Sequence, residues 1–182
     1  MRKLLQFLFI LSLGVICCAC VNTFAVHELN EKGFEYMENG DNEAAVSRFE
    51  ASIDLDGEIY ESRYNLGTAY INSGKCKEAI PHLKKATTLR PKEPIAFYSL
   101  GIAGTCAAKN VYEGKDAKGR KFEITYTKPK EIEQAKKEHD EYLAISIEAF
   151  ERYLQIVPNA EDAIQINDTI KAARETLSHS DK

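Results

Sequence analysis

Apolar and polar residues alternate along the chain with the spacing of amphipathic helices. In one clear stretch, Ala79, Leu83 and Ala86 recur three or four positions apart and are separated by polar residues. Such a stripe is typical of a helix with one buried face. Gly74 lies before this stretch and Pro91 follows it, which favours helix ends at both places. The pattern from residue 58 to 93 therefore predicts two helices joined by a tight turn.

The same pattern returns with a fixed period along the chain. Gly67 lies in the first of these two helices, and Gly33 and Gly101 stand 34 positions before and after it. Because the chain has only 10 glycines, two matches in phase indicate a true repeat. A helix–turn–helix period of 34 residues resembles the tetratricopeptide repeat. The resemblance implies an all-α solenoid with repeats at about 26–57, 58–93 and 94–158.

The third repeat is interrupted between its two helices. Gly67 and Pro91 are 24 positions apart, whereas Gly101 and Pro158, their equivalents, are 57 apart. The extra residues place an insertion at about 109–141.

The insertion begins with a strand-like pattern. Phe122, Ile124 and Tyr126 alternate with polar residues, as on a half-buried strand. Val111 and Tyr112 are a candidate partner strand, so the sequence predicts a small β-hairpin.

Long helices are expected after the hairpin. Pro129 suits a first helical turn, and no glycine or proline follows it until Pro158. A capping helix over 159–177 then closes the solenoid. Its apolar residues share one stripe: Ala163, Ile166, Ile170, Ala173 and Leu177.

The N-terminus carries the features of an export signal. Arg2 and Lys3 precede an apolar run over 4–21, as in a secretory signal peptide. The run is also about long enough for an uncleaved membrane anchor, since roughly 17–25 residues span a bilayer.

The end of this run resembles a bacterial lipobox. Ala19 precedes Cys20, which makes Cys20 the candidate for acylation after removal of a signal peptide at 1–20. Cys18 is a second candidate, and cleavage after Ala25 without acylation is a third alternative. Val21 follows Cys20 in place of the aspartate that retains some lipoproteins in the inner membrane. We therefore expect a periplasm-facing lipoprotein, with the outer membrane favoured, whose tetratricopeptide domain spans 21–182.

Charge narrows the range of partners. Without residues 1–20 the chain has 28 acidic and 22 basic residues, a net charge of −6. This acidity argues against nucleic acid as a partner. It also argues against adhesion to anionic lipid, so membrane attachment would depend on the N-terminal lipid anchor.

The sequence shows no catalytic, metal or cofactor site. Its histidines are scattered without the spacing of metal ligands: His27, His82, His139 and His179. We therefore predict a protein–protein interaction module and not an enzyme. The alternative is an enzyme, or a regulator of one, with its site in the insertion at 109–141.

The family resemblance also implies where a protein or peptide partner binds. The first helix of each repeat lines a concave groove, and projecting that face onto this chain gives ten candidates: Asn30, Phe34, Tyr64, Asn65, Thr68, Asn72, Tyr98, Ser99, Ile102 and Thr105. Aromatic and small polar residues of this kind suit an extended peptide. Alternatively, Phe34 and Tyr64 simply pack against a neighbouring helix.

The chaperone-binding branch of the family holds a C-terminal carboxylate with a clamp of lysine, asparagine and arginine. Here only Asn65 matches, and the cationic positions carry Asn30, Ile95 and Ser99. This ligand class is therefore not expected.

Two cysteines fall in neighbouring predicted helices. Cys76 and Cys106 each lie about 15 residues from the turn near Pro91 that joins those helices, so antiparallel packing would place them level with each other. An exported compartment is oxidising, which makes a disulfide possible. Two separate buried thiols are the alternative, because level residues need not face each other.

Overall fold

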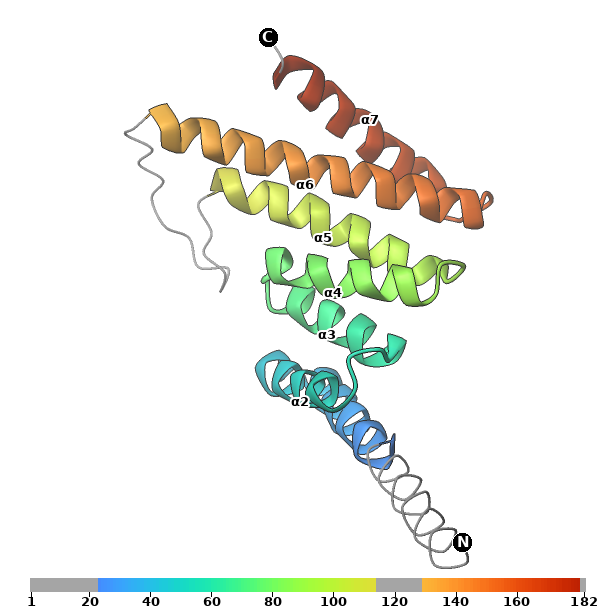
Figure 1. Ribbon diagram of the computed structural model, residues 1–182. Helices are drawn as coiled ribbons and strands as arrows, with labels where there is room; N and C mark the ends of the chain where they lie inside the picture. Colours follow the sequence, from blue (N-terminus) through green and yellow to red (C-terminus); the bar gives the residue numbers. More distant parts are fainter. Residues whose placement is uncertain (1–22, 114–128, 181–182) are drawn as a thin grey trace, which may run out of the picture.

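The computed structural model describes residues 23–113 and 129–180, and these contain helices but no strand. After helical residues 23–38 come α2 (Asn42–Leu55), α3 (Tyr60–Asn72), α4 (Cys76–Leu89), α5 (Pro94–Glu113), α6 (Pro129–Ile156) and α7 (Ala163–Ser180). From α2 onward each helix packs against the next one. Figure 1 shows them stacked side by side in chain order, with alternating directions. The prediction of an all-helical solenoid is confirmed.

Glycine ends the first helix of each of the first two pairs. Gly40 and Gly74 have φ angles of 79° and 74°, a left-handed conformation that glycine adopts without steric cost. Directly after Gly40, Asp41 caps α2, because its Oδ1 accepts a hydrogen bond of 3.0 Å from the Ala44 amide. Both features tighten the turn, so the two helices of a pair lie against each other.

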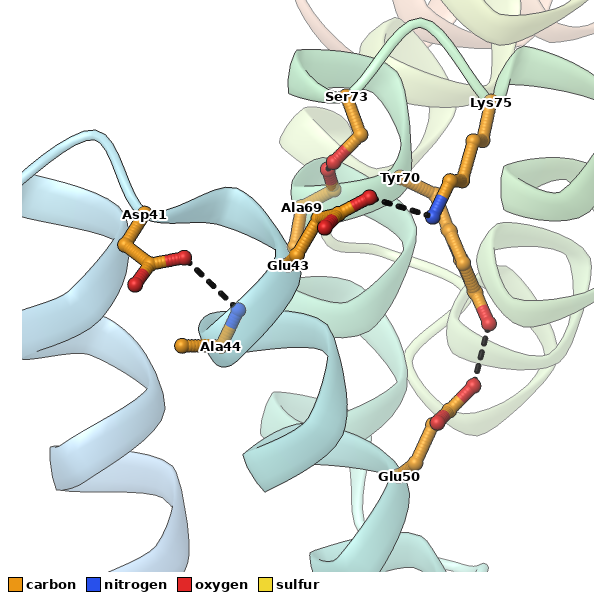
Figure 2. A network of polar contacts seen from close by, with 8 residues as sticks. All are labelled: Asp41, Glu43, Ala44, Glu50, Ala69, Tyr70, Ser73 and Lys75. Carbon is orange, nitrogen blue, oxygen red and sulfur yellow. Dashed lines mark hydrogen bonds and ion pairs between the residues drawn. The ribbon is translucent and has the colours of Figure 1, made fainter. Parts of the chain in front are cut away.

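Polar side chains join the first helical pair to the second (Figure 2). Lys75, in the turn after α3, reaches Glu43 on α2 at 3.7 Å. The Tyr70 hydroxyl donates to Glu50 on α2 at 2.5 Å. These contacts are at the surface, so each adds only about 0–1 kcal/mol to the packing of the two pairs.

The repeated glycines allow the two helices of each pair to approach closely. In every pair the glycine faces a large apolar side chain of the second helix: Gly33 with Phe49, Gly67 with Leu83, and Gly101 with Phe150. A Cβ at Gly33 would lie 2.6 Å from a ring carbon of Phe49, closer than atoms can pack. These apolar side chains are all but excluded from solvent, with 0–3 % exposed, and burial of each stabilises the fold by about 1.5–3 kcal/mol.

The structure corrects the predicted hairpin. Residues 111–113, which include the proposed partner strand at Val111, continue α5 to Glu113, and Val111 packs against the apolar core. The other proposed strand, at 122–126, lies outside the described residues. The insertion therefore begins as an extension of α5 and ends as an extension of α6, which starts at Pro129 as predicted and has 28 residues.

The last helix covers the end of the solenoid. α7 begins at Ala163 and not at residue 159. Ile166, Ile170 and Ala173 are 4–7 % exposed and face inward. Ile164 is 79 % exposed, so the helix turns one apolar stripe to α6 and the other residues to solvent.

A disulfide joins the second helical pair to the third. Cys76, at the start of α4, is bonded to Cys106 on α5, with Cα atoms 5.8 Å apart. The two positions thus lie level and face each other across the antiparallel pair, within the Cα distance that a disulfide needs.

The candidate lipidation site Cys20 and the rest of residues 1–22 lie outside the described part of the chain. Among residues 23–113 and 129–180, no helix is both long and apolar enough to cross a bilayer.

Candidate functional site

A hollow of about 630 Å³ opens between helical residues 23–38 and α3. Its lining comes from one face of the first helix, from the residue before α3, and from α3 itself: Thr23, Val26, His27, Asn30, Glu31, Phe34, Glu35, Glu38, Ile59, Glu61 and Asn65. The hollow thus lies where two successive first helices meet, the position expected for a groove in a helical-repeat solenoid.

Apolar side chains form part of the hollow. Val26 is 4 % exposed and belongs to the core, and Ile59 lies before α3. Phe34 is 48 % exposed, although burying it would be favourable by about 1.5–3 kcal/mol. An exposed aromatic ring inside a hollow is typical of an anchoring point for a bound side chain.

A buried polar cluster holds the floor of the hollow in place. The Asn30 amide nitrogen Nδ2 donates to the hydroxyls of Ser52 on α2 at 2.9 Å and of Ser62 on α3 at 2.8 Å. The two serine hydroxyls are also bonded to each other at 2.8 Å, and both serines are fully buried. Asn30 therefore fixes the first helix against its two neighbours. Within the described residues, its buried oxygen Oδ1 has no hydrogen-bond donor.

Glutamates form the walls. Glu31, Glu35 and Glu38 recur at i, i+4 and i+7 on the first helix, and so lie on one face of it. Glu61 faces them from α3. These four residues were not among the groove candidates predicted from the sequence. Their helical spacing was the available signal, but a run of acidic residues more often marks a solvated face.

A cation and two tyrosines support the α3 wall. Arg90 forms an ion pair with Glu61, and its guanidinium lies 4.3 Å from the centre of the Tyr60 ring, as in a cation–π contact. The Tyr60 ring stacks on Tyr64 with 5.8 Å between the ring centres. Burial, together with the nearby Glu93 carboxylate, raises the pKa of Tyr60 to about 12, so its hydroxyl stays neutral at physiological pH.

Three of the ten groove candidates line the hollow, namely Asn30, Phe34 and Asn65. Two neighbours on α3 are used internally: Tyr64 packs against Tyr60, and the Thr68 hydroxyl donates to the Tyr64 carbonyl at 3.0 Å. Asn72, the last residue of α3, is exposed.

The candidates on α5 are not brought into this hollow. The Tyr98 ring packs against Phe150 and Tyr153 on α6, with ring centres 6.0 Å and 5.3 Å away. The Thr105 hydroxyl lies 2.7 Å from the Ser146 hydroxyl on α6. Ser99 is buried, and Ile102 is 36 % exposed. The predicted groove is thus divided into a hollowed first part and a second part in which most of the side chains pack inward.

A second hollow of about 620 Å³ lies among α4, α5 and α6. Its charges are mixed, because Lys84 and Arg152 are balanced by Glu148 and Glu151. Arg152 lies 6.0 Å from the centre of the Phe97 ring. No group of three or more histidine, cysteine, aspartate or glutamate side chains within 23–113 and 129–180 is arranged to hold a metal ion.

Comparison with protein families gives a direct match. Residues 31–94 and 64–109 match the family model described as "Tetratricopeptide repeat". No curated protein sequence matches the chain.

Solved structures show the same fold. The first tetratricopeptide domain of Spaghetti (RPAP3), bound to the HSP90 peptide SRMEEVD, is 18 % identical, with a TM-score of 0.58 over 84 % of this chain and 93 % of that one. The type III secretion chaperone SycD of Yersinia enterocolitica, in complex with a peptide of the translocator YopD, is 15 % identical, with a TM-score of 0.56 over 82 % and 92 %. At such identities the likeness concerns the fold, and both structures are peptide complexes.

Proposed function

Because residues 31–94 and 64–109 match the tetratricopeptide-repeat family model, we propose that the chain is a protein-interaction module that binds an extended segment of a partner in the hollow beside Phe34. The observation that carries this proposal is the half-exposed Phe34 ring in a hollow of about 630 Å³. Pockets of this size suit a few side chains of a peptide. Peptide binding by the two similar folds, from the RPAP3 and SycD structures, supports the same use.

The hollow is also held rigid before a partner arrives. Asn30 bonds to serines of both neighbouring helices, and Glu61 is fixed by Arg90. A preformed site loses less conformational entropy on binding. The acidic HSP90 peptide is not the ligand we propose, because the hollow is walled by four glutamates.

A peptide-display selection against the full chain in mild detergent tests this function. Selected peptides should bind the wild-type protein and lose about tenfold or more in affinity for Phe34→Ser, a change of about 1.4 kcal/mol. Phe24→Ser is the matched control, since Phe24 lies on the same helix, is 73 % exposed and does not line the hollow. An equal loss of affinity in both variants, or an affinity that Phe34→Ser leaves unchanged, would contradict the proposal.

We also propose that the protein is a periplasm-facing lipoprotein of the bacterial envelope, anchored through acylated Cys20. The apolar run before Ala19 and Cys20 supports this. Detergent phase separation of wild type and Cys20→Ser is the test. Unchanged partitioning and unchanged mature mass in the variant would rule out Cys20.

A further inference from the structure

The charges around the hollow are one-sided. Its lining contains four glutamates and neither lysine nor arginine, and its remaining titratable side chain is His27. Lys32, on the same helix but outside the lining, pairs with Glu28 at 2.6 Å, and Arg90 pairs with the lining residue Glu61. The hollow is therefore a region of negative potential on the first helix.

Two of these carboxylates are left for a ligand. Glu31 lies 3.5 Å from His27, which is charged only when protonated. Within residues 23–113 and 129–180, Glu35 and Glu38 have neither an ion pair nor a hydrogen bond from a side chain. Both are exposed, and both lie within four positions of Phe34. An apolar contact surface thus stands next to two uncompensated negative charges.

From this arrangement we infer that the partner segment is basic, with an apolar side chain that packs on Phe34 and lysine or arginine that reaches Glu35 and Glu38. This inference rests on the proposed binding function and names the chemistry of its ligand. Arginine suits the site well, because its guanidinium can bond a carboxylate through two parallel hydrogen bonds.

Charge complementarity of this kind has a measurable consequence. Attraction between exposed charges is screened by salt, because the Debye length falls from about 30 Å at 0.01 M to about 3 Å at 1 M. Affinity of the hollow for a basic segment should therefore fall as salt rises, mainly through slower association. An apolar partner held by Phe34 alone would show no such fall.

The test uses three synthetic peptides of equal length, with blocked ends and a central leucine. Lysine and arginine flank the leucine in the first, serine in the second, and glutamate and aspartate in the third. Fluorescence anisotropy with the full chain in mild detergent, at about 50 mM and about 500 mM salt, gives their affinities. The basic peptide should bind about tenfold or more tightly than the serine peptide at low salt, and this preference should disappear at high salt.

The double variant Glu35→Gln/Glu38→Gln isolates the two carboxylates. It should lose the preference for the basic peptide and its salt dependence. The matched control is Glu161→Gln/Glu175→Gln, which changes the net charge equally at two exposed residues far along the chain from the hollow. If both double variants lose the preference equally, a general charge effect explains the binding and the inference fails.

The remaining outcomes separate this inference from the proposed function. If the serine or acidic peptide binds as tightly as the basic one, and Phe34→Ser weakens that binding, the hollow is a binding site but its partner is not basic. If none of the three peptides binds and the display selection also fails at Phe34, both the inference and the proposed function are wrong.

Discussion

The first and third helical pairs follow one pattern and use their first helices in opposite ways. In both, a glycine faces a phenylalanine of the second helix, Gly33 with Phe49 and Gly101 with Phe150. Beyond this contact, the first helix of the first pair presents Phe34 and several glutamates to a hollow. In the third pair, α5 turns two of its four groove candidates toward α6.

The difference arises from the second helices. Tyr153 on α6 stands at the repeat position that Ser52 occupies on α2 of the first pair, and its ring packs against Tyr98. Ser146 stands at the position of Ala45 on α2, and its hydroxyl lies against the Thr105 hydroxyl. The repeat pattern therefore determines which faces pack together, whereas the size and polarity of the second helix decide how much of the first remains available to a ligand.

Truncation of the two equivalent phenylalanines tests this comparison with the largest expected effect. Phe49→Ala and Phe150→Ala should each cost about 3–5 kcal/mol of local stability. A repeat contacts only its neighbours, so the two losses of stability should appear in different places. Phe49→Ala should make the first pair unfold at a lower urea concentration than the rest of the protein. Phe150→Ala should lower the urea concentration at the midpoint of the main unfolding transition. Urea unfolding combined with native-state hydrogen exchange distinguishes them.

Ile164→Ala, at a residue 79 % exposed, is the control and should change the free energy of unfolding by no more than about 0.5 kcal/mol. If Phe49→Ala and Phe150→Ala both shift the midpoint of one unfolding transition by the same amount, the two pairs unfold as a single unit.

The disulfide should stabilise the second and third pairs and leave the first pair unaffected. It links residues 30 positions apart, and closing such a loop in the unfolded chain stabilises the native state by about 3–4 kcal/mol. Reduction, or the double variant Cys76→Ala/Cys106→Ala, should lower the free energy of unfolding in the main transition by that amount. Hydrogen exchange in 23–38 should not change.

Mass spectrometry of the unreduced protein after alkylation is the first measurement here. Modification at Cys76 and Cys106 would mean that the bond is not formed in the purified protein, and reduction would then have no effect on the unfolding transition.

The 34-residue period was sufficient to predict the fold. Each pair needs a glycine where its two helices come into close contact, so glycines recur at positions 33, 67 and 101. The partner strand at Val111 was wrong, since a short apolar segment fits a strand or a helix end equally well. In the site, Asn30, Phe34 and Asn65 were predicted, whereas the glutamates were missed. Their role depends on Glu61 approaching from α3, a tertiary contact that no local pattern contains.

Gly104 lies in the contact between α5 and α6, and Gly67 lies in the contact between α3 and α4. Replacing each with alanine should compare how much added volume the two helix contacts tolerate. At Gly104 a Cβ would lie 2.8 Å from the Tyr142 carbonyl oxygen and 2.9 Å from the Ser146 amide nitrogen. These are backbone atoms, so the helices must separate, and Gly104→Ala should cost about 2–3 kcal/mol.

At Gly67 the added Cβ would lie 2.5 Å from Cγ of the buried Leu83, so a side chain and not the backbone has to shift. Better helix propensity, about 1 kcal/mol, also offsets the cost there. Gly67→Ala should therefore be the milder variant in urea unfolding. A larger loss at Gly67 than at Gly104 would contradict the view that α5 and α6 form the less adaptable contact.

The smallest expected effect concerns His82 on α4, at the boundary between the two regions. Burial lowers the pKa of His82 below its usual 6.5, and the Arg63 guanidinium on α3 lowers it further, while Glu50 opposes this. Arg63 Nη1 lies 3.2 Å from His82 Nδ1, and the Tyr70 ring packs 5.7 Å from the imidazole. Protonation would therefore place two cations together in the contact between α3 and α4.

The direction of the pH dependence follows from linkage. Below about pH 6.5 the unfolded chain gains a proton at His82 that the folded chain resists, so the free energy of unfolding should fall as the pH drops below 6.5. In His82→Gln this part of the decrease should be absent, whereas His179→Gln, at an exposed residue, should behave as wild type. Urea unfolding at about pH 7.5, 6.5 and 5.5 measures it. Parallel pH profiles of wild type and His82→Gln would show that the contact between α3 and α4 tolerates the charged imidazole.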